Sequence, residues 1–126
     1  MSIRSGLVTF LKVAVGNSRV YSLRMPQSPS YPLIVYTIIS TEDQITYEGP
    51  LSLKETAVQL DFWSKKIEEV DALEQVVKEA LVGYKGPMGD IAYTAGWKRE
   101  SVVDMYESDT GLYRIAVDYR GKYSEV

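Results

Sequence analysis

The stretch ETAVQLDFWSKKIEEVDALEQVVKEALVG, residues 55–83, decides the fold. In its first part Val58, Leu60 and Phe62 alternate with polar residues, which predicts a strand with one buried face. After Ser64, a suitable N-cap, apolar residues recur at helical spacing up to a C-capping Gly83: Ile67, Val70, Leu73, Val77, Ala80 and Leu81. A one-faced strand followed by an amphipathic helix predicts a helix packed on a sheet.

The composition is that of one globular domain, residues 1–126. The chain is 45% hydrophobic and 25% charged, and its length suits a single core. No apolar run approaches the roughly 20 residues that span a bilayer, and no signal peptide is evident at the N-terminus. We therefore expect no membrane association, and we expect the chain to stay in the cytoplasm of the cell that makes it.

The chain contains no cysteine and no histidine, which removes whole classes of chemistry. Disulfides, Cys/His zinc sites, cysteine nucleophiles and Ser-His-Asp triads are all excluded. The net charge of -3 and the isolated basic pairs Lys65-Lys66 and Lys98-Arg99 argue against general nucleic-acid binding.

The remaining acidic and glycine-rich segments have structural explanations. Asp104, Glu107 and Asp109 lie close together, but their spacing does not reproduce an EF-hand loop, so we interpret them as a solvated turn. The glycines of residues 83–89 follow a helix and precede a strand, the reverse of a phosphate-binding loop. We therefore predict no catalytic, cofactor or metal site, and no enzymatic activity.

The N-terminal half predicts a helix, a rigid loop and a central strand. Apolar residues at helical spacing predict a short first helix: Ile3, Leu7, Phe10, Leu11 and Ala14. Three prolines make residues 25–32 an extended loop after a brief strand at 19–22. Residues 33–40 are apolar and β-branched on both faces, which indicates a strand covered on both sides. The long helix supplies one cover, and either the first helix or another protein chain supplies the other.

A polar segment, residues 41–50, follows the central strand. We predict a projecting arm or long hairpin that contacts other proteins without supporting the fold; its contact candidates are Glu42, Asp43, Gln44, Tyr47 and Glu48. Residues 91–103 and 112–123 alternate as two strands of a C-terminal hairpin, with Gly96 leaving room for a bulge or a close neighbour. The predicted fold class is α+β: a mostly antiparallel sheet of four to five strands, one long helix packed on it, and a short N-terminal helix.

Aromatic residues mark candidate subunit interfaces. The chain has 10 tyrosines and 2 phenylalanines, and amphipathic rings suit surfaces that become buried on assembly, although they also edge ordinary cores. Trp63 falls on the polar side of its strand, which fits either a protein interface or a sheet face beneath the first helix. The interface candidates are Tyr36, Trp63 and Trp97.

Several segments, in order along nearly the whole chain, resemble the small tail-terminator family of long-tailed phages and prophages. They are RVYSLRMPQ at 19–27, YPLIVY at 31–36, YEGP at 47–50, ETAVQLDFW at 55–63 and YESDTGLYR at 106–114. The resemblance implies an α+β subunit that forms a hexameric ring at the head-proximal end of the tail tube. It implies contacts with the major tail tube protein and a head-tail connector protein, and a location in the virion tail.

Two other functions compete with this one. A stopper or adaptor of the head-tail connector would differ only in the neighbours it touches. A small-ligand-binding protein would instead require a deep cleft with converging polar groups, where a ring subunit needs a flat, complementary surface.

Overall fold

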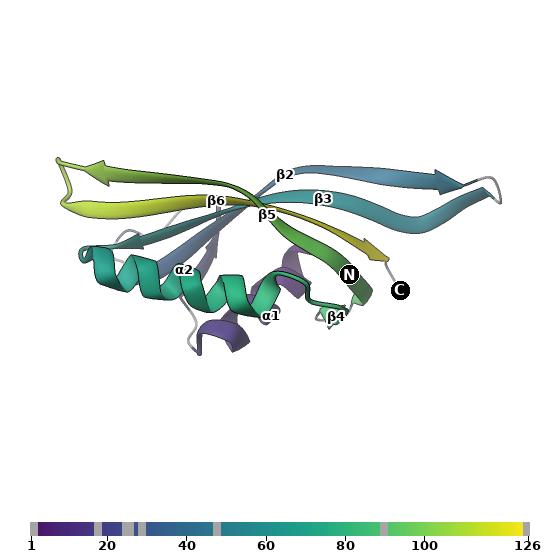
Figure 1. The fold of residues 1–126 in the computed structure, drawn as a ribbon, viewed down its shortest axis with the longest axis horizontal. Coiled ribbons are helices and arrows are strands. Elements are labelled where there is room, and N and C mark those ends of the chain that lie inside the picture. The colour runs from purple at the N-terminus through teal and green to yellow at the C-terminus, as the bar shows by residue number, and fades with distance from the viewer. Residues whose placement is uncertain are drawn as a thin grey trace.

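The computed structural model describes residues 3–16, 19–23, 27, 30–46, 49–88 and 91–124 (Figure 1). Two helices and six strands are present in these residues. Their order is α1 (Ile3–Val15), β1 (Val20–Ser22), β2 (Leu33–Thr46), β3 (Gly49–Ser64), α2 (Ile67–Leu81), β4 (Gly86–Met88), β5 (Ile91–Glu107) and β6 (Leu112–Ser124).

The strands form one mixed sheet in the order β1-β2-β3-β6-β5-β4. Strand β1 pairs with β2 in parallel, and the other neighbouring strands are antiparallel. The prediction of four to five mostly antiparallel strands with one long helix is therefore wrong. The prediction missed β4, a three-residue strand in the glycine-rich segment 83–89, where no strand was expected. It also described α1 as short, although its 13 residues nearly match the 15 of α2.

Both helices pack on the same face of the sheet, which Figure 1 shows below the strands. The core between helices and sheet contains alternate residues of the central strands, including Ile34, Leu60, Phe62 and Val117. Strand alternation predicted this face correctly for Val58, Leu60 and Phe62. The first helix does not cover the opposite face, because it lies beside α2 over the same side of the sheet.

Helix α2 follows the predicted span, but its buried stripe differs from the predicted one. Its buried residues are Val70, Glu74, Val77 and Leu81, whereas Ile67 is 41% exposed. The Ser64 hydroxyl accepts a hydrogen bond from the Lys66 amide and donates one of 2.5 Å to Glu69, although the helix N-cap itself is Lys66. The predicted left-handed glycine is confirmed, since Gly83 has φ +78° just after the helix end.

The far face of the sheet is the face turned away from both helices. Register places the following residues on it: Val35, Asp61, Trp63, Val103, Arg114 and Ala116. Val35 is 4% exposed, and Ile34, on the helix face, is fully buried. The predicted two-sided burial of residues 33–40 therefore holds for residues 33–36, but it is wrong for Ile39, which is 55% exposed.

Candidate subunit and tail-contact surfaces

The predicted arm is the β2–β3 hairpin, which projects from one end of the sheet (Figure 1). The pairing of β2 with β3 continues past Leu53, the last residue of β3 that pairs with β6, and ends with Thr46 opposite Gly49. The contact candidates Glu42, Asp43 and Gln44 lie in β2, whereas Tyr47 and Glu48 lie outside the described residues.

Two of the three predicted interface aromatics belong to the subunit's own core. Tyr36 and Trp97 are each 2% exposed and join the cluster beneath the helices. The Trp97 ring lies against Gly121, where an added Cβ would come within 2.4 Å of the ring's Cδ2. A register shift between Ala95 and Lys98, next to Gly96 at φ +70°, confirms the predicted bulge at this point. Neither ring is therefore accessible to another protein chain.

Trp63 is the interface candidate that lies toward the surface. It is partly exposed on the far face, with the Arg114 guanidinium 5.2 Å from its ring centroid. Arg114 also donates a 3.0 Å hydrogen bond to Asp61, which is 7% exposed. Burial raises the pKa of the Asp61 carboxyl, and the Arg114 charge opposes that rise. Trp63 thus forms one side of an ordered aromatic and charged group on this face.

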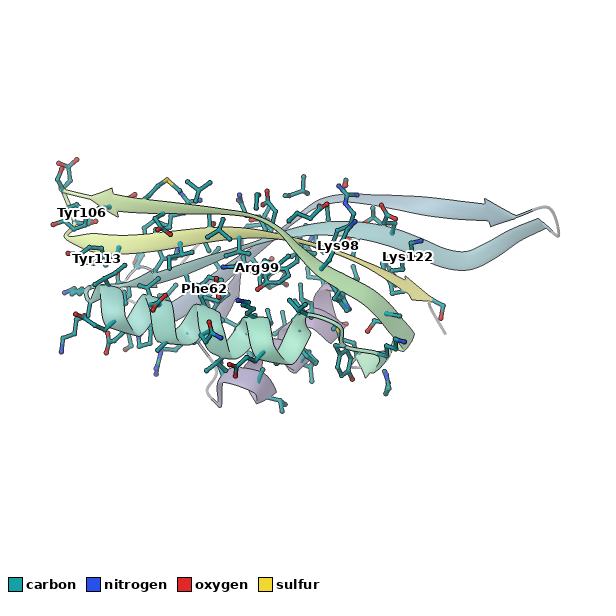
Figure 2. All side chains as sticks on the ribbon, viewed as in Figure 1. Phe62, Lys98, Arg99, Tyr106, Tyr113 and Lys122 are labelled. Atoms are coloured by element: carbon teal, nitrogen blue, oxygen red, sulfur yellow. The ribbon has the colours of Figure 1, made fainter. Side chains whose placement is uncertain are left out.

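A second exposed surface lies on the free end of β5 and was missed in the sequence. Asp104, Glu107 and Asp109 were expected to lie in a solvated turn, but β5 continues to Glu107 and pairs with β6 as far as Glu107 opposite Leu112. Four apolar side chains of this segment are more than a third exposed: Val102, Val103, Met105 and Tyr106. Figure 2 shows Tyr106 beside Tyr113 at the hairpin tip, with ring centroids 4.8 Å apart. The sequence did contain a sign of this longer strand: Val103 and Met105 alternate with Asp104 and Tyr106 immediately before the turn that leads to the regular strand 112–123.

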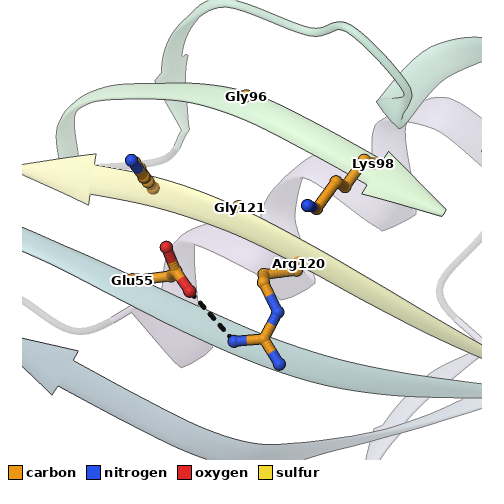
Figure 3. Close-up of a pocket in the computed structure, with 6 residues that line it drawn as sticks. Glu55, Gly96, Lys98, Arg120 and Gly121 are labelled. Carbon is orange, nitrogen blue, oxygen red and sulfur yellow. Dashed lines mark hydrogen bonds and ion pairs between the residues drawn. The ribbon is translucent and has the colours of Figure 1, made fainter. Parts of the chain in front are cut away.

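A hollow of about 340 Å³ lies where β5 bulges away from β6 (Figure 3). Its charged lining consists of Glu55, Lys98, Arg120 and Lys122. Arg120 donates hydrogen bonds of 3.0 Å to both Glu100 and Glu55, which raise the pKa of its guanidinium. The guanidinium is thus engaged by carboxylates of its own chain and is not directed at a ligand.

A buried ion pair connects α2 to the sheet. Arg99 of β5 donates a hydrogen bond to Glu74, whose side chain is 7% exposed. The neighbouring Tyr119 is fully buried, and desolvation, aided by the Glu74 charge, raises the pKa of its phenol to about 12. This cluster holds the helix against the long β5 strand.

The acidic residues of the last hairpin are divided between a strand and a turn, since Asp104 and Glu107 lie in β5 and Asp109 in the turn that follows. The Glu107 side chain accepts a 3.0 Å hydrogen bond from the Thr110 hydroxyl, and its backbone carbonyl accepts a 2.8 Å bond from the Gly111 amide. In the described part of the chain, no group of three or more acidic side chains is arranged to hold a metal ion. Neither of the two described helices is long and apolar enough to cross a membrane.

Comparison with known proteins identifies the family. Residues 8–124 match the family model described as tail completion protein gp17. A solved structure described as the virion of a native gene transfer agent particle contains a chain of similar fold, with a TM-score of 0.55 and 17% sequence identity. The similarity covers 90% of this chain and 84% of that one. No curated protein sequence matches. Since the family model spans nearly the whole chain, the protein belongs to the phage tail-completion protein family and is a structural component of the virion tail.

Proposed function

We propose that this protein forms a ring that caps the head-proximal end of the phage tail tube, stops tail polymerisation and joins the tail to the head. The observation that carries the proposal is the tail-completion family match over residues 8–124. The shape of the subunit supports it, because two long hairpins project from opposite ends of one sheet (Figure 1). Such a subunit can reach neighbours on both sides while its helix-covered core stays intact.

The β2–β3 arm is the proposed contact with the tail tube or the connector. It continues outward beyond the part of the sheet that the helices cover (Figure 1), so its loss would not open the core. The proposed partners are further copies of this chain in a hexameric ring, the major tail tube protein and a head-tail connector protein. In this role the protein acts in the host cytoplasm during assembly and has no catalytic activity.

Electron microscopy of tails assembled with and without the protein tests the proposal. With the protein, tails should have uniform length and carry extra ring density at one end. Without it, tube polymerisation should continue and give overlong tubes that do not attach to heads. A stopper or adaptor would give a different result: the protein's density would lie on the head side of an already capped tail, and tails made without the protein would have normal length.

A further inference from the structure

Strand β5 has a long outer edge without a strand partner in the described part of the chain. Strand β4 pairs with β5 only through Thr94 and Ile91, and the Gly83 amide donates to the carbonyl of Trp97. Strand β6 occupies only the inner edge. Residues 98–107, here called the β5 edge, therefore direct unpaired backbone groups outward.

Strand β2 has a matching outer edge on the other side of the sheet. Strand β1 pairs with β2 only through residues 34–36, and the Leu23 amide donates to the Tyr36 carbonyl. Beyond that point the described residues supply a partner for β2 on its inner edge alone, which is β3. Residues 37–46, here called the β2 edge, equal the β5 edge in length.

The outer part of the β5 edge lacks the usual protection of an exposed strand. Edges are normally short, or are protected by proline, bulges or charged side chains, to prevent association with other strands. Residues 101–106 contain no proline and a single charged residue, Asp104, and they expose Val103 by 51% and Tyr106 by 56%. The β2 edge likewise exposes Ile39 by 55%. Long edges with exposed apolar side chains are suited to pairing with another strand.

The strand order favours a second copy of this chain as the partner. Strands β2, β3, β6 and β5 are each antiparallel to the next. A second copy added in the same orientation would therefore place its β2 edge antiparallel to the β5 edge and continue the alternation.

End-to-end alignment of the two edges places Met105 and Tyr106 level with Ile39 and Ile38 of the next copy. Among the described residues, neither β1 nor β4 overlaps the two edges, because each edge begins where those short strands stop and ends at a hairpin turn.

We propose that the β5 edge of each subunit pairs antiparallel with the β2 edge of the next, so that one sheet runs through neighbouring subunits. The contact joins two different surfaces, as a closed ring requires. This inference rests on the proposed ring and specifies how its subunits are joined.

Disulfide trapping tests the contact directly, because the natural chain has no cysteine. Met105→Cys combined with Ile39→Cys should give, under oxidation, a ladder of covalent oligomers that ends at the ring. Within one subunit these positions are separated by β3 and β6, about 14 Å or more, which is too far for a disulfide. The partner cysteine is also placed at Thr37 and Thr41 to cover neighbouring registers. Val13→Cys with Ile39→Cys is the control, since Val13 is exposed on α1.

A charged substitution supplies an independent readout. Val103→Lys should lower the association constant between copies more than tenfold while leaving the unfolding midpoint of the subunit unchanged. Val76→Lys, at a similarly exposed site on α2, should change neither.

Each result decides the proposal. Cross-linking of Met105→Cys alone, as efficient as that of the pair, would show two-fold β5–β5 pairing and overturn it. The edge contact would be refuted, and the proposed function left intact, if rings formed on tails but no cysteine pair cross-linked in any register and the Val103→Lys variant assembled normally. A natural protein that neither self-associates nor binds tails would refute both.

Discussion

The Glu74–Arg99 ion pair gives the most quantitative prediction about this fold. It joins the middle of α2 to β5, and the two side chains differ in exposure, at 7% for Glu74 and 29% for Arg99. Removing either member leaves the other without its partner, but only Arg99 can turn toward solvent. The two single substitutions should therefore have unequal effects on the free energy of unfolding.

Arg99→Met should be the more damaging change, because it leaves an unpaired carboxylate beneath the helix. Breaking a buried ion pair costs about 3–5 kcal/mol. Since Arg99 is partly exposed and its attraction is screened by solvent, we expect about 2–3 kcal/mol here. In a domain of this size that corresponds to a fall in the melting temperature of roughly 10 °C. Glu74→Met should cost less, about 1 kcal/mol, because the guanidinium that remains can be hydrated.

The double variant Glu74→Met, Arg99→Met separates pair formation from packing. With both charges replaced by apolar side chains of similar length, its stability should return to within about 1 kcal/mol of the natural protein. Urea denaturation followed by tryptophan fluorescence and by circular dichroism measures all four proteins of the cycle. The reasoning would be wrong if Arg99→Met cost less than Glu74→Met, or if the two losses simply added.

Four further predictions concern the core, the pH response, the arm and the interface. Gly121→Ala should lose about 1–3 kcal/mol of stability in urea denaturation, because its Cβ would overlap the Trp97 ring; unchanged stability would contradict the observed packing. Between pH 10 and 12 the folded protein keeps the Tyr119 proton that the unfolded chain releases, so stability should fall as pH rises through that window, by up to about 3 kcal/mol. Tyr119→Phe should flatten that fall, and an unaltered alkaline profile would exclude this residue as its source. Deletion of residues 42–48 should leave the melting temperature nearly unchanged while abolishing tail attachment; an unfolded product would place the arm in the core. Trp63→Ala should weaken association by about 2 kcal/mol, measured by oligomer mass; an earlier-melting subunit with normal assembly would remove Trp63 from the interface.

Short-range patterns predicted much of the fold. The alternation of Val58, Leu60 and Phe62, the helix ending near Gly83, and the bulge at Gly96 all follow from the preferences of neighbouring residues. The polar hairpin arm was visible for the same reason. The candidate interfaces were predicted less well, because an aromatic residue carries no local sign of whether its own core or another subunit will bury it. Tyr36 and Trp97 are buried by their own core, whereas Trp63 remains partly exposed.

The sequence by itself determined the strand-helix unit of residues 55–83, the two-sided burial of residues 33–36 in the central strand, and the absence of cysteine and histidine chemistry. Each depends on side-chain type and on periodicity within one segment. The tertiary structure alone decided that Glu74 is buried against Arg99, that Gly121 receives the Trp97 ring, and that both helices share one face. It also decided which parts of β2 and β5 lack a neighbouring strand. These features arise between residues far apart in the chain, and a hydrogen-bonding edge becomes free or paired only when the whole sheet has assembled.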